Sequence, residues 1–179
     1  MLTLILLRHA KSDWSDPSHA DFDRPLAPRG KAAAPRMGRH MRRIGIRPDH
    51  IVCSPARRTR ETLALVMPEL QLLTADVVYD EAVYEAPATR LLERIQGVSA
   101  TLRTVMLVGH NPGLQELILH LAQPDASGSY AEIARKFPTT ALAVLEFDST
   151  TWAAIRETPG RITHLMTPRR LDDASTDES

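Results

Sequence analysis

Short apolar runs that alternate with helical patterns constrain the fold of this chain more than any other feature of the sequence. The first run, Leu2–Leu7, is continuous, and shorter runs follow at His50–Cys53 and Val105–Val108. Uninterrupted apolar runs of this length are typical of strands buried on both faces of a sheet. Because helical patterns lie between them, we predict an α/β fold: a three-layer sandwich with a mostly parallel central sheet flanked by helices.

Helices are predicted between and after these strands. Pro35 lies within the first helix and predicts a kink or a late start. Ser54-Pro55 and Asn111-Pro112 each have the pattern of a helix cap followed by proline at the first helical position. The predicted helices are Lys31–Ile44, a second from Ser54 that ends before Pro68, Pro87–Gln96 closed by Gly97, and a fourth from Asn111 to about Ala122.

The rest of the chain fits one domain. Further strands are predicted at Asp76–Tyr79, Ala141–Phe147, Thr151–Arg156 and Ile162–Met166. With no internal repeat and no long linker, residues 1–171 should form a single domain. Residues 172–179 are mainly Asp, Ser, Thr and Glu, a composition that buries little apolar surface. We predict that they form a disordered acidic tail.

Charge and hydropathy argue against several classes of protein. Lys and Arg together number 22, as do Asp and Glu, so the chain lacks the basic excess of a general nucleic-acid binder. Its apolar runs fall short of the roughly 20 residues that cross a bilayer, and the first lacks the flanks of a secretory signal. The single cysteine, Cys53, excludes an internal disulfide and fits a reducing compartment. We expect a cytoplasmic protein with no nucleic-acid or membrane partner.

Histidine and arginine residues follow three of the predicted strands. Arg8 and His9 follow the first, Arg58 lies just beyond the second, and His110 follows the third. In a parallel sheet these strand ends share the edge at which ligands bind, so the side chains should converge. Arginine forks bind phosphate oxygens, and a neutral imidazole can attack phosphorus. The sequence therefore predicts a phosphate site.

The residue types suggest a role for each histidine. His9 is the candidate nucleophile, and nearby arginines should disfavour its imidazolium form and keep it neutral. A protonated His110 could stabilise the phosphate oxygens as charge shifts during transfer. Helix N-termini after Ser54 and Asn111 would add backbone donors.

Several segments match one known family in the right order. Arg8–Ala10 resembles the Arg-His-Gly signature of the histidine phosphatase superfamily, which includes the phosphoglycerate mutases, with alanine in place of glycine. Ser54–Arg58 and Gly109–Pro112 resemble its second and third signatures. Asp23–Leu26, followed by Arg29-Gly30, is similar to the segment before the family's first helix. Together the matches cover most of the chain.

The resemblance implies a metal-independent phosphatase that forms a covalent phosphohistidine intermediate on His9. Arg8, Arg58 and His110 would complete the phosphate pocket. Ser15 lies where related enzymes often have a phosphate-contacting asparagine. No metal or organic cofactor is implied.

The compact spacing resembles the SixA type, which removes phosphate from phosphohistidine on signalling proteins. Longer relatives insert a cap between the second and third signatures, whereas residues 69–104 leave room for a strand and one helix. We therefore expect little or no cap insertion. The substrate would be a phosphomonoester or a phosphohistidine, and the partner a phosphorylated small molecule or a phosphohistidine-bearing protein.

The general acid is left open by the sequence. The family usually takes this acid from a glutamate after the strand that follows the second signature. Glu81 lies near that place as a possible proton donor, and Glu85 is a second candidate. SixA-type enzymes often lack the acid, since a nitrogen leaving group departs more easily than an alkoxide.

Other readings of the same residues were weighed. A cysteine phosphatase would use Cys53, but Thr59 stands where its arginine belongs. A metal-dependent phosphatase could draw on His19, Asp21 and Asp23, which lack tight metal-ligand spacing. A phosphate-binding regulatory module without turnover is an alternative from a different class. A small-molecule phosphatase or mutase of the same superfamily is another.

Overall fold

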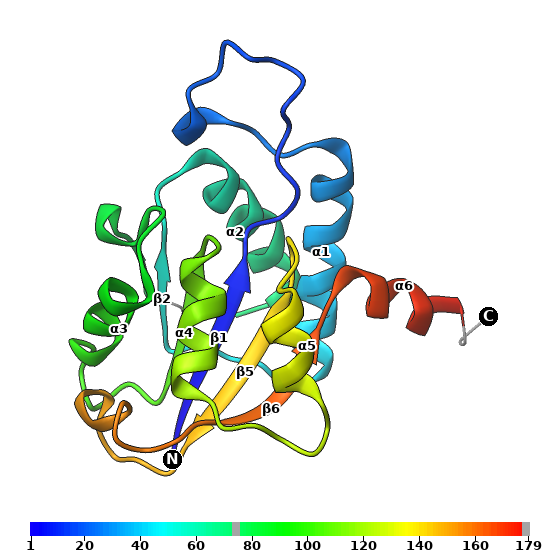
Figure 1. Ribbon diagram of the computed structural model, residues 1–179. Coiled ribbons are helices and arrows are strands. Elements are labelled where there is room, and N and C mark those ends of the chain that lie inside the picture. The colour runs from blue at the N-terminus through cyan, green and yellow to red at the C-terminus, as the bar shows by residue number, and fades with distance from the viewer. Residues whose placement is uncertain (73–75, 177–179) are drawn as a thin grey trace.

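One mixed sheet runs through the middle of the molecule (Figure 1). The computed structural model describes residues 1–72 and 76–176, and within these ranges six strands form the sheet. They are β1 (Leu2–Arg8), β2 (His50–Cys53), β3 (Asp76–Tyr79), β4 (Thr104–Gly109), β5 (Leu142–Phe147) and β6 (Arg161–Met166). Their order is β3-β2-β4-β1-β5-β6. The pairs β1–β4, β2–β4 and β2–β3 are parallel, whereas β5 is antiparallel to both β1 and β6. This confirms the mostly parallel sheet.

Helices cover both faces of this sheet (Figure 1). One face carries α1 (Pro28–Arg43), α2 (Arg57–Leu70) and α6 (Pro168–Thr176), and the other α3 (Ala88–Gln96), α4 (Gly113–Leu121) and α5 (Ser129–Arg135). Three short 3-10 helices also occur in the described ranges: η1 (Asp21–Asp23), η2 (Glu81–Val83) and η3 (Trp152–Ala154). Among the described residues, no helix is long and apolar enough to cross a membrane.

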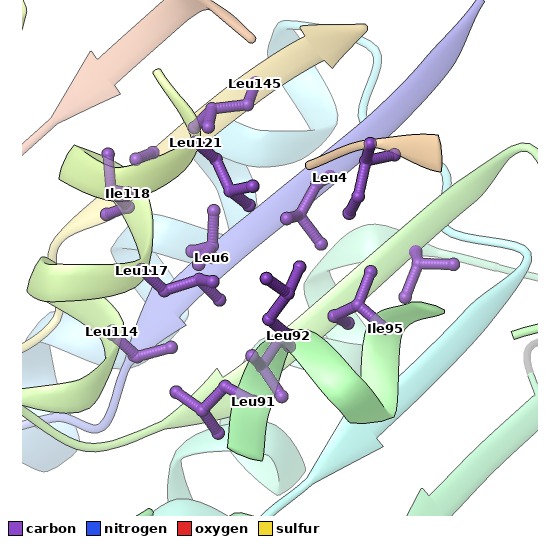
Figure 2. Close-up of a cluster of buried hydrophobic side chains, with 14 of the residues drawn as sticks. Leu4, Leu6, Leu91, Leu92, Ile95, Leu114, Leu117, Ile118, Leu121 and Leu145 are labelled. Atoms are coloured by element: carbon purple, nitrogen blue, oxygen red, sulfur yellow. The ribbon is translucent and has the colours of Figure 1, made fainter. Parts of the chain in front are cut away.

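The first strand explains the three layers. Successive side chains of a strand point to opposite faces. The side chains of β1 therefore alternate between the two hydrophobic clusters, one on each face of the sheet. Leu4 and Leu6 point toward α3 and α4, where they pack with Leu117 (Figure 2). Ile5 and Leu7 belong to the cluster under α1 and α2. Burial of each such side chain stabilises the fold by about 1.5–3 kcal/mol, so an all-apolar strand is stable only in the middle layer.

The first two helices differ from their predicted bounds. α1 begins at Pro28, three residues before the predicted start, and continues through Pro35. α2 continues through Pro68 to Leu70, where the sequence predicted an end. Leu70 is fully buried, and this burial stabilises the last turn of α2 despite the missing proline N–H.

Neither predicted cap-and-proline pair starts a helix. α2 begins at Arg57 after Ala56, and α4 begins after Pro112. The Asn111 side chain instead donates to the carbonyl of Phe137 at 2.9 Å. The residues of both pairs therefore belong to loops at the edge of the sheet, next to the ends of β2 and β4.

Three further differences concern the C-terminal third of the chain. The predicted strand Thr151–Arg156 is wrong: η3 lies there, and the buried Trp152 indole donates to the carbonyl of Leu102. α5 was not predicted. The expected disordered tail begins inside α6, where Asp172 pairs with Arg36; residues 177–179 lie outside the described residues.

The segment between the second and third signatures is short. In its described residues, the interval from α2 to β4 contains β3, η2 and α3. This agrees with the expectation of little or no cap insertion. The strand ends of β1, β2 and β4 therefore have a short connection beside them, which carries Tyr84 and Glu85.

Candidate active site

Three neighbouring strands bring the predicted residues together. β1 and β4 are adjacent and in register at Arg8 and Gly109, and β2 lies on the other side of β4. The His9 N–H donates to the Gly109 carbonyl at 3.1 Å, and the Ser54 N–H donates to Val108 at 3.0 Å. His9, Ser54 and His110 thus emerge side by side from one edge, as the parallel sheet requires.

The His9 ring is held by its own main chain. Its Nδ1 lies 2.8 Å from the carbonyl oxygen of Ala10. Because a carbonyl only accepts hydrogen bonds, Nδ1 carries the proton and Nε2 keeps a free lone pair. Ala10 is fixed in turn, since its N–H donates to the Thr62 hydroxyl at 2.9 Å. The sequence thus folds so that the potentially nucleophilic nitrogen is the one turned away from the main chain.

Burial keeps this ring neutral. The pKa of His9 is lowered from 6.5 to about 4, first by burial and then by the charges of Arg58 and Arg8, although the Ala10 hydrogen bond and the charge of Asp21 act in the opposite direction. The sequence analysis attributed neutrality to the arginines, but burial is the larger cause. At neutral pH the Nε2 lone pair is therefore available for attack.

His110 lies beside His9. The two rings have centroids 5.3 Å apart, and His110 Nε2 is 2.7 Å from the Ser54 hydroxyl. Burial first, and then His9, lowers the pKa of His110 to about 3, so the expected protonated form is corrected to a neutral ring. If the Ser54 hydroxyl donates to Nε2, the neutral ring presents Nδ1–H as a donor.

Two arginines complete the group. Arg8 donates to the Phe137 carbonyl at 2.8 Å. The Arg58 side chain is 5% exposed and donates to the Asp21 carbonyl at 2.6 Å, to the Asp21 carboxylate at 3.0 Å and to Glu85 at 3.1 Å. Burial, and then Arg58, lowers the pKa of Arg8. The charges of the two arginines therefore act on each other, and guanidinium groups are suited to bind the oxygens of a phosphate.

Unpaired donors indicate where an anion would bind. Within the described ranges, Arg8 Nε and His110 Nδ1 are buried and without a hydrogen-bond partner. An unsatisfied buried donor costs about 1–3 kcal/mol. Oxygens of a phosphate group between the two side chains would satisfy both.

The remaining predicted residues lie at different distances from this group. Ser15 is exposed, and its recorded hydrogen bond is local, from its N–H to Asp13. Glu81 is exposed in η2. Glu85, by contrast, contacts Arg58. Its φ of 46° lies in the left-handed region, which residues other than glycine rarely adopt. Of the two candidate acids, Glu85 is the one in contact with a predicted site residue.

Sequence reasoning missed three residues of this site. Ser54 was interpreted as a helix cap, although its place at the end of β2 is the same kind of signal that singled out His9. Asp21 was weighed only as a metal ligand. Tyr84, between the two glutamates, donates to the Asp21 carboxylate at 2.7 Å and lies edge-on to the His110 ring. Nothing local in the sequence marks that contact.

Two of the alternative readings can be compared with the structure. Burial raises the pKa of Cys53 to about 12, so this thiol stays protonated and is a poor nucleophile. In residues 1–72 and 76–176, no three His, Cys, Asp or Glu side chains gather as ligands of a metal ion would.

Comparison with known proteins identifies the class. The sequence profile of the histidine phosphatase superfamily (branch 1) matches residues 4–91. An uncharacterized protein of Mycobacterium tuberculosis, Rv1276c, is 38% identical over 143 residues, which cover 78% of this chain and 85% of that one. An uncharacterized chloroplastic protein of Arabidopsis thaliana is 36% identical over 63% of this chain and 56% of its own length. This chain belongs to the histidine phosphatase superfamily.

Within the superfamily, SixA structures are similar over nearly the whole chain. A candidate phosphohistidine phosphatase SixA from Nakamurella multipartitia superposes with a TM-score of 0.81 and 30% identity, over 93% of this chain and 96% of that one. Another, from Agrobacterium tumefaciens, gives 0.79 and 30% over 93% and 98%. The structural similarity therefore extends well past residue 91, where the matched profile ends.

Proposed function

We propose that this protein is a metal-independent phosphatase that hydrolyses phosphomonoester or phosphohistidine substrates through a phosphohistidine intermediate on His9. The observation that carries the proposal is the hydrogen bond from His9 Nδ1 to the Ala10 carbonyl. It leaves Nε2 unprotonated beside two arginines and the unpaired Nδ1 of His110.

The proposed reaction has two steps. The Nε2 lone pair of His9 forms a bond to phosphorus, the bond to the leaving oxygen or nitrogen breaks, and its electron pair departs with the leaving group. A water molecule then attacks phosphorus, the P–Nε2 electron pair returns to His9, and inorganic phosphate leaves. Donors from Arg8, Arg58 and His110 stabilise the negative charge on the phosphate oxygens in both steps.

The leaving group sets the need for an acid. An ester oxygen leaves more easily when it is protonated. We take Glu85 rather than Glu81 as the candidate donor because of its position, since it lies against Arg58. We propose no role for Ser15 in this step. The SixA neighbours and the short connection between α2 and β4 favour a phosphohistidine-bearing protein as partner, with a phosphorylated small molecule as the alternative. A cytoplasmic location fits the single cysteine.

The test compares the wild type with His9→Ala and with the control His120→Ala, whose side chain is exposed on α4. Turnover of an aryl phosphate and of a phosphohistidine-bearing protein is measured with a chelator present. We expect both the wild type and the control to retain activity, and His9→Ala to lose at least about a thousandfold. A radiolabelled, acid-labile phosphoenzyme should form in the wild type but not in His9→Ala. Equal turnover by all three proteins would refute the assignment of His9.

A further inference from the structure

A carboxylate lies on the phosphate-binding arginine. Asp21 accepts from Arg58 Nη2 at 3.0 Å and from the Tyr84 hydroxyl at 2.7 Å. Although its burial works the other way, the hydrogen bond from Tyr84 and the charge of Arg58 hold the pKa of Asp21 below its usual value. The group is therefore a stable anion at neutral pH.

Burial shows which part of a substrate would face this anion. His9, His110 and Arg58 are 7%, 4% and 4% exposed, so a phosphoryl group has to enter to that depth. The Asp21 side chain is 39% exposed and lies at the solvent side of Arg58. A phosphate bound at His9 would thus direct its leaving group outward, past Asp21.

The charge of Asp21 also acts electrostatically on His9 and His110. Its charge raises the pKa of both His9 and His110, against the effects of burial and of the arginines. The same charge repels a phosphate dianion at His9, since a carboxylate and a phosphate within a few ångströms disfavour each other. For a phosphatase this is a disadvantage unless the substrate brings a positive charge to the same place.

The surroundings of Asp21 also favour a cation. The Tyr84 ring lies edge-on to Phe22 with centroids 5.1 Å apart, and Phe22 is 37% exposed. Aromatic faces attract cations, particularly where water is partly excluded. A carboxylate and two aromatic rings along the outward path together match a positively charged nitrogen.

We propose that Asp21 is a specificity-determining residue that selects substrates whose nitrogen leaving group is protonated, and disfavours plain phosphate esters. This rests on the proposed function. In phosphoramidate the nitrogen bound to phosphorus carries the extra proton before cleavage, and in a phosphohistidine the other ring nitrogen carries it. His9 Nε2 then bonds to phosphorus, the P–N bond breaks, and its electron pair stays on nitrogen, so that a neutral amine or a neutral imidazole leaves. Asp21 holds the cation in the bound substrate and accepts no proton.

The experiment uses two small substrates that share a phosphoryl group. Phosphoramidate has a protonated nitrogen leaving group at neutral pH, and p-nitrophenyl phosphate has an oxygen leaving group without positive charge. The variant is Asp21→Asn, in which the side-chain oxygen still accepts from Arg58 and Tyr84. Asp23→Asn is the matched control, because Asp23 is an exposed residue of the same 3-10 helix and loses the same charge. Asp21→Glu keeps the charge.

We expect kcat/KM for phosphoramidate to fall at least about tenfold in Asp21→Asn, while that for p-nitrophenyl phosphate stays level or rises. Inorganic phosphate should inhibit Asp21→Asn at a concentration lower by about two- to tenfold. Asp23→Asn should behave like the wild type, and Asp21→Glu should keep the preference for phosphoramidate. Retained turnover of the aryl ester also shows that the variant is folded.

Other outcomes would overturn the inference in distinguishable ways. An equal fall for both substrates would mean that Asp21 only positions Arg58. No change for either would mean that it takes no part. If the wild type turned over neither these two substrates nor a phosphohistidine-bearing protein, the proposed function would fail and this inference with it.

Discussion

At the scale of single residues, one hydrogen bond decides which nitrogen of His9 can react. The Ala10 carbonyl accepts from Nδ1, so Nε2 is the basic atom. Thr62 fixes Ala10, because its hydroxyl accepts the Ala10 N–H while donating to the Arg58 carbonyl at 2.6 Å. The proposed nucleophile and Arg58, a proposed phosphate-binding residue, are therefore oriented through the same threonine, and a change at Thr62 would disturb both.

The first prediction concerns the titration of His9. Because its pKa is lowered from 6.5 to about 4, the neutral reactive form persists as pH falls below 6 and is lost only near 4. The signal of the His9 ring in an NMR titration of the unliganded protein should have its midpoint near 4. A midpoint near the ordinary value of 6.5 would contradict the argument that burial of the His9 ring lowers its pKa.

The second prediction concerns Ser54. In Ser54→Ala, Nε2 of the buried His110 ring loses its partner; Nδ1 has none already, so the tautomer of the ring is no longer fixed. We expect kcat/KM to fall about tenfold, which corresponds to about 1.4 kcal/mol of lost transition-state stabilisation. Steady-state kinetics with an aryl phosphate would measure this. Ser99→Ala, in an exposed turn, is the control, and equal rates for the two variants would exclude a role for the hydroxyl.

At the scale of helices and strands, serine and asparagine can either cap a helix or bind a side chain or carbonyl in a functional site. Ser54 and Asn111 both precede proline, which predicts a helix start, yet neither caps a helix. Their side chains are instead directed to His110 and to the Phe137 carbonyl. Local pattern cannot distinguish the two uses, because the competing partner comes from a segment at least 26 residues away in the chain.

Pro68 gives a prediction at this scale. It is an exposed residue inside α2, where it removes one N–H from the helix. Pro68→Ala restores that donor, and we expect the free energy of unfolding to rise by about 1–2 kcal/mol, less than the full helix penalty because the unfolded chain also gains freedom. Urea unfolding would measure the change. An unchanged kcat/KM is expected as well, since Pro68 lies near the end of α2 remote from Arg58, and a loss of stability would contradict the argument.

At the scale of the whole molecule, the sequence predicts the strands that are continuous apolar runs, together with their arrangement in the sheet. β1, β2 and β4 are such runs, and their parallel order followed from the helices between them, so His9, Arg58 and His110 were found to share one edge. Contacts between distant segments could not be predicted. Asp21 and Tyr84 are 63 residues apart and meet where η1, in the segment after β1, contacts the residue that follows η2. The proposed catalytic residues can thus be predicted from the strand ends, whereas the residues around the proposed path of the leaving group cannot.

A second pair of histidines, outside the candidate active site, leads to a prediction of how acid affects the stability of the fold. His40 of α1 and His164 of β6 have Nε2 atoms 2.7 Å apart. Arg43 only donates, so His40 Nδ1 accepts from it and His40 Nε2–H donates to His164. Such a bond exists only while His164 is neutral. Burial lowers the pKa of His40 to about 4 and also lowers that of His164.

The sign of the effect follows from these directions. The unfolded chain takes up protons on these rings near pH 6.5, whereas the folded protein does so only at lower pH, so stability present above 6.5 is lost as pH falls toward 4. We expect His164→Gln to lessen this loss by at most about 1.4 kcal/mol per pH unit, with urea unfolding at pH 7, 6, 5 and 4.5 as the measurement. His120→Gln, on the exposed face of α4, should keep the steepness of the wild type. If His164→Gln kept it too, the pair would not couple α1 and β6 to pH.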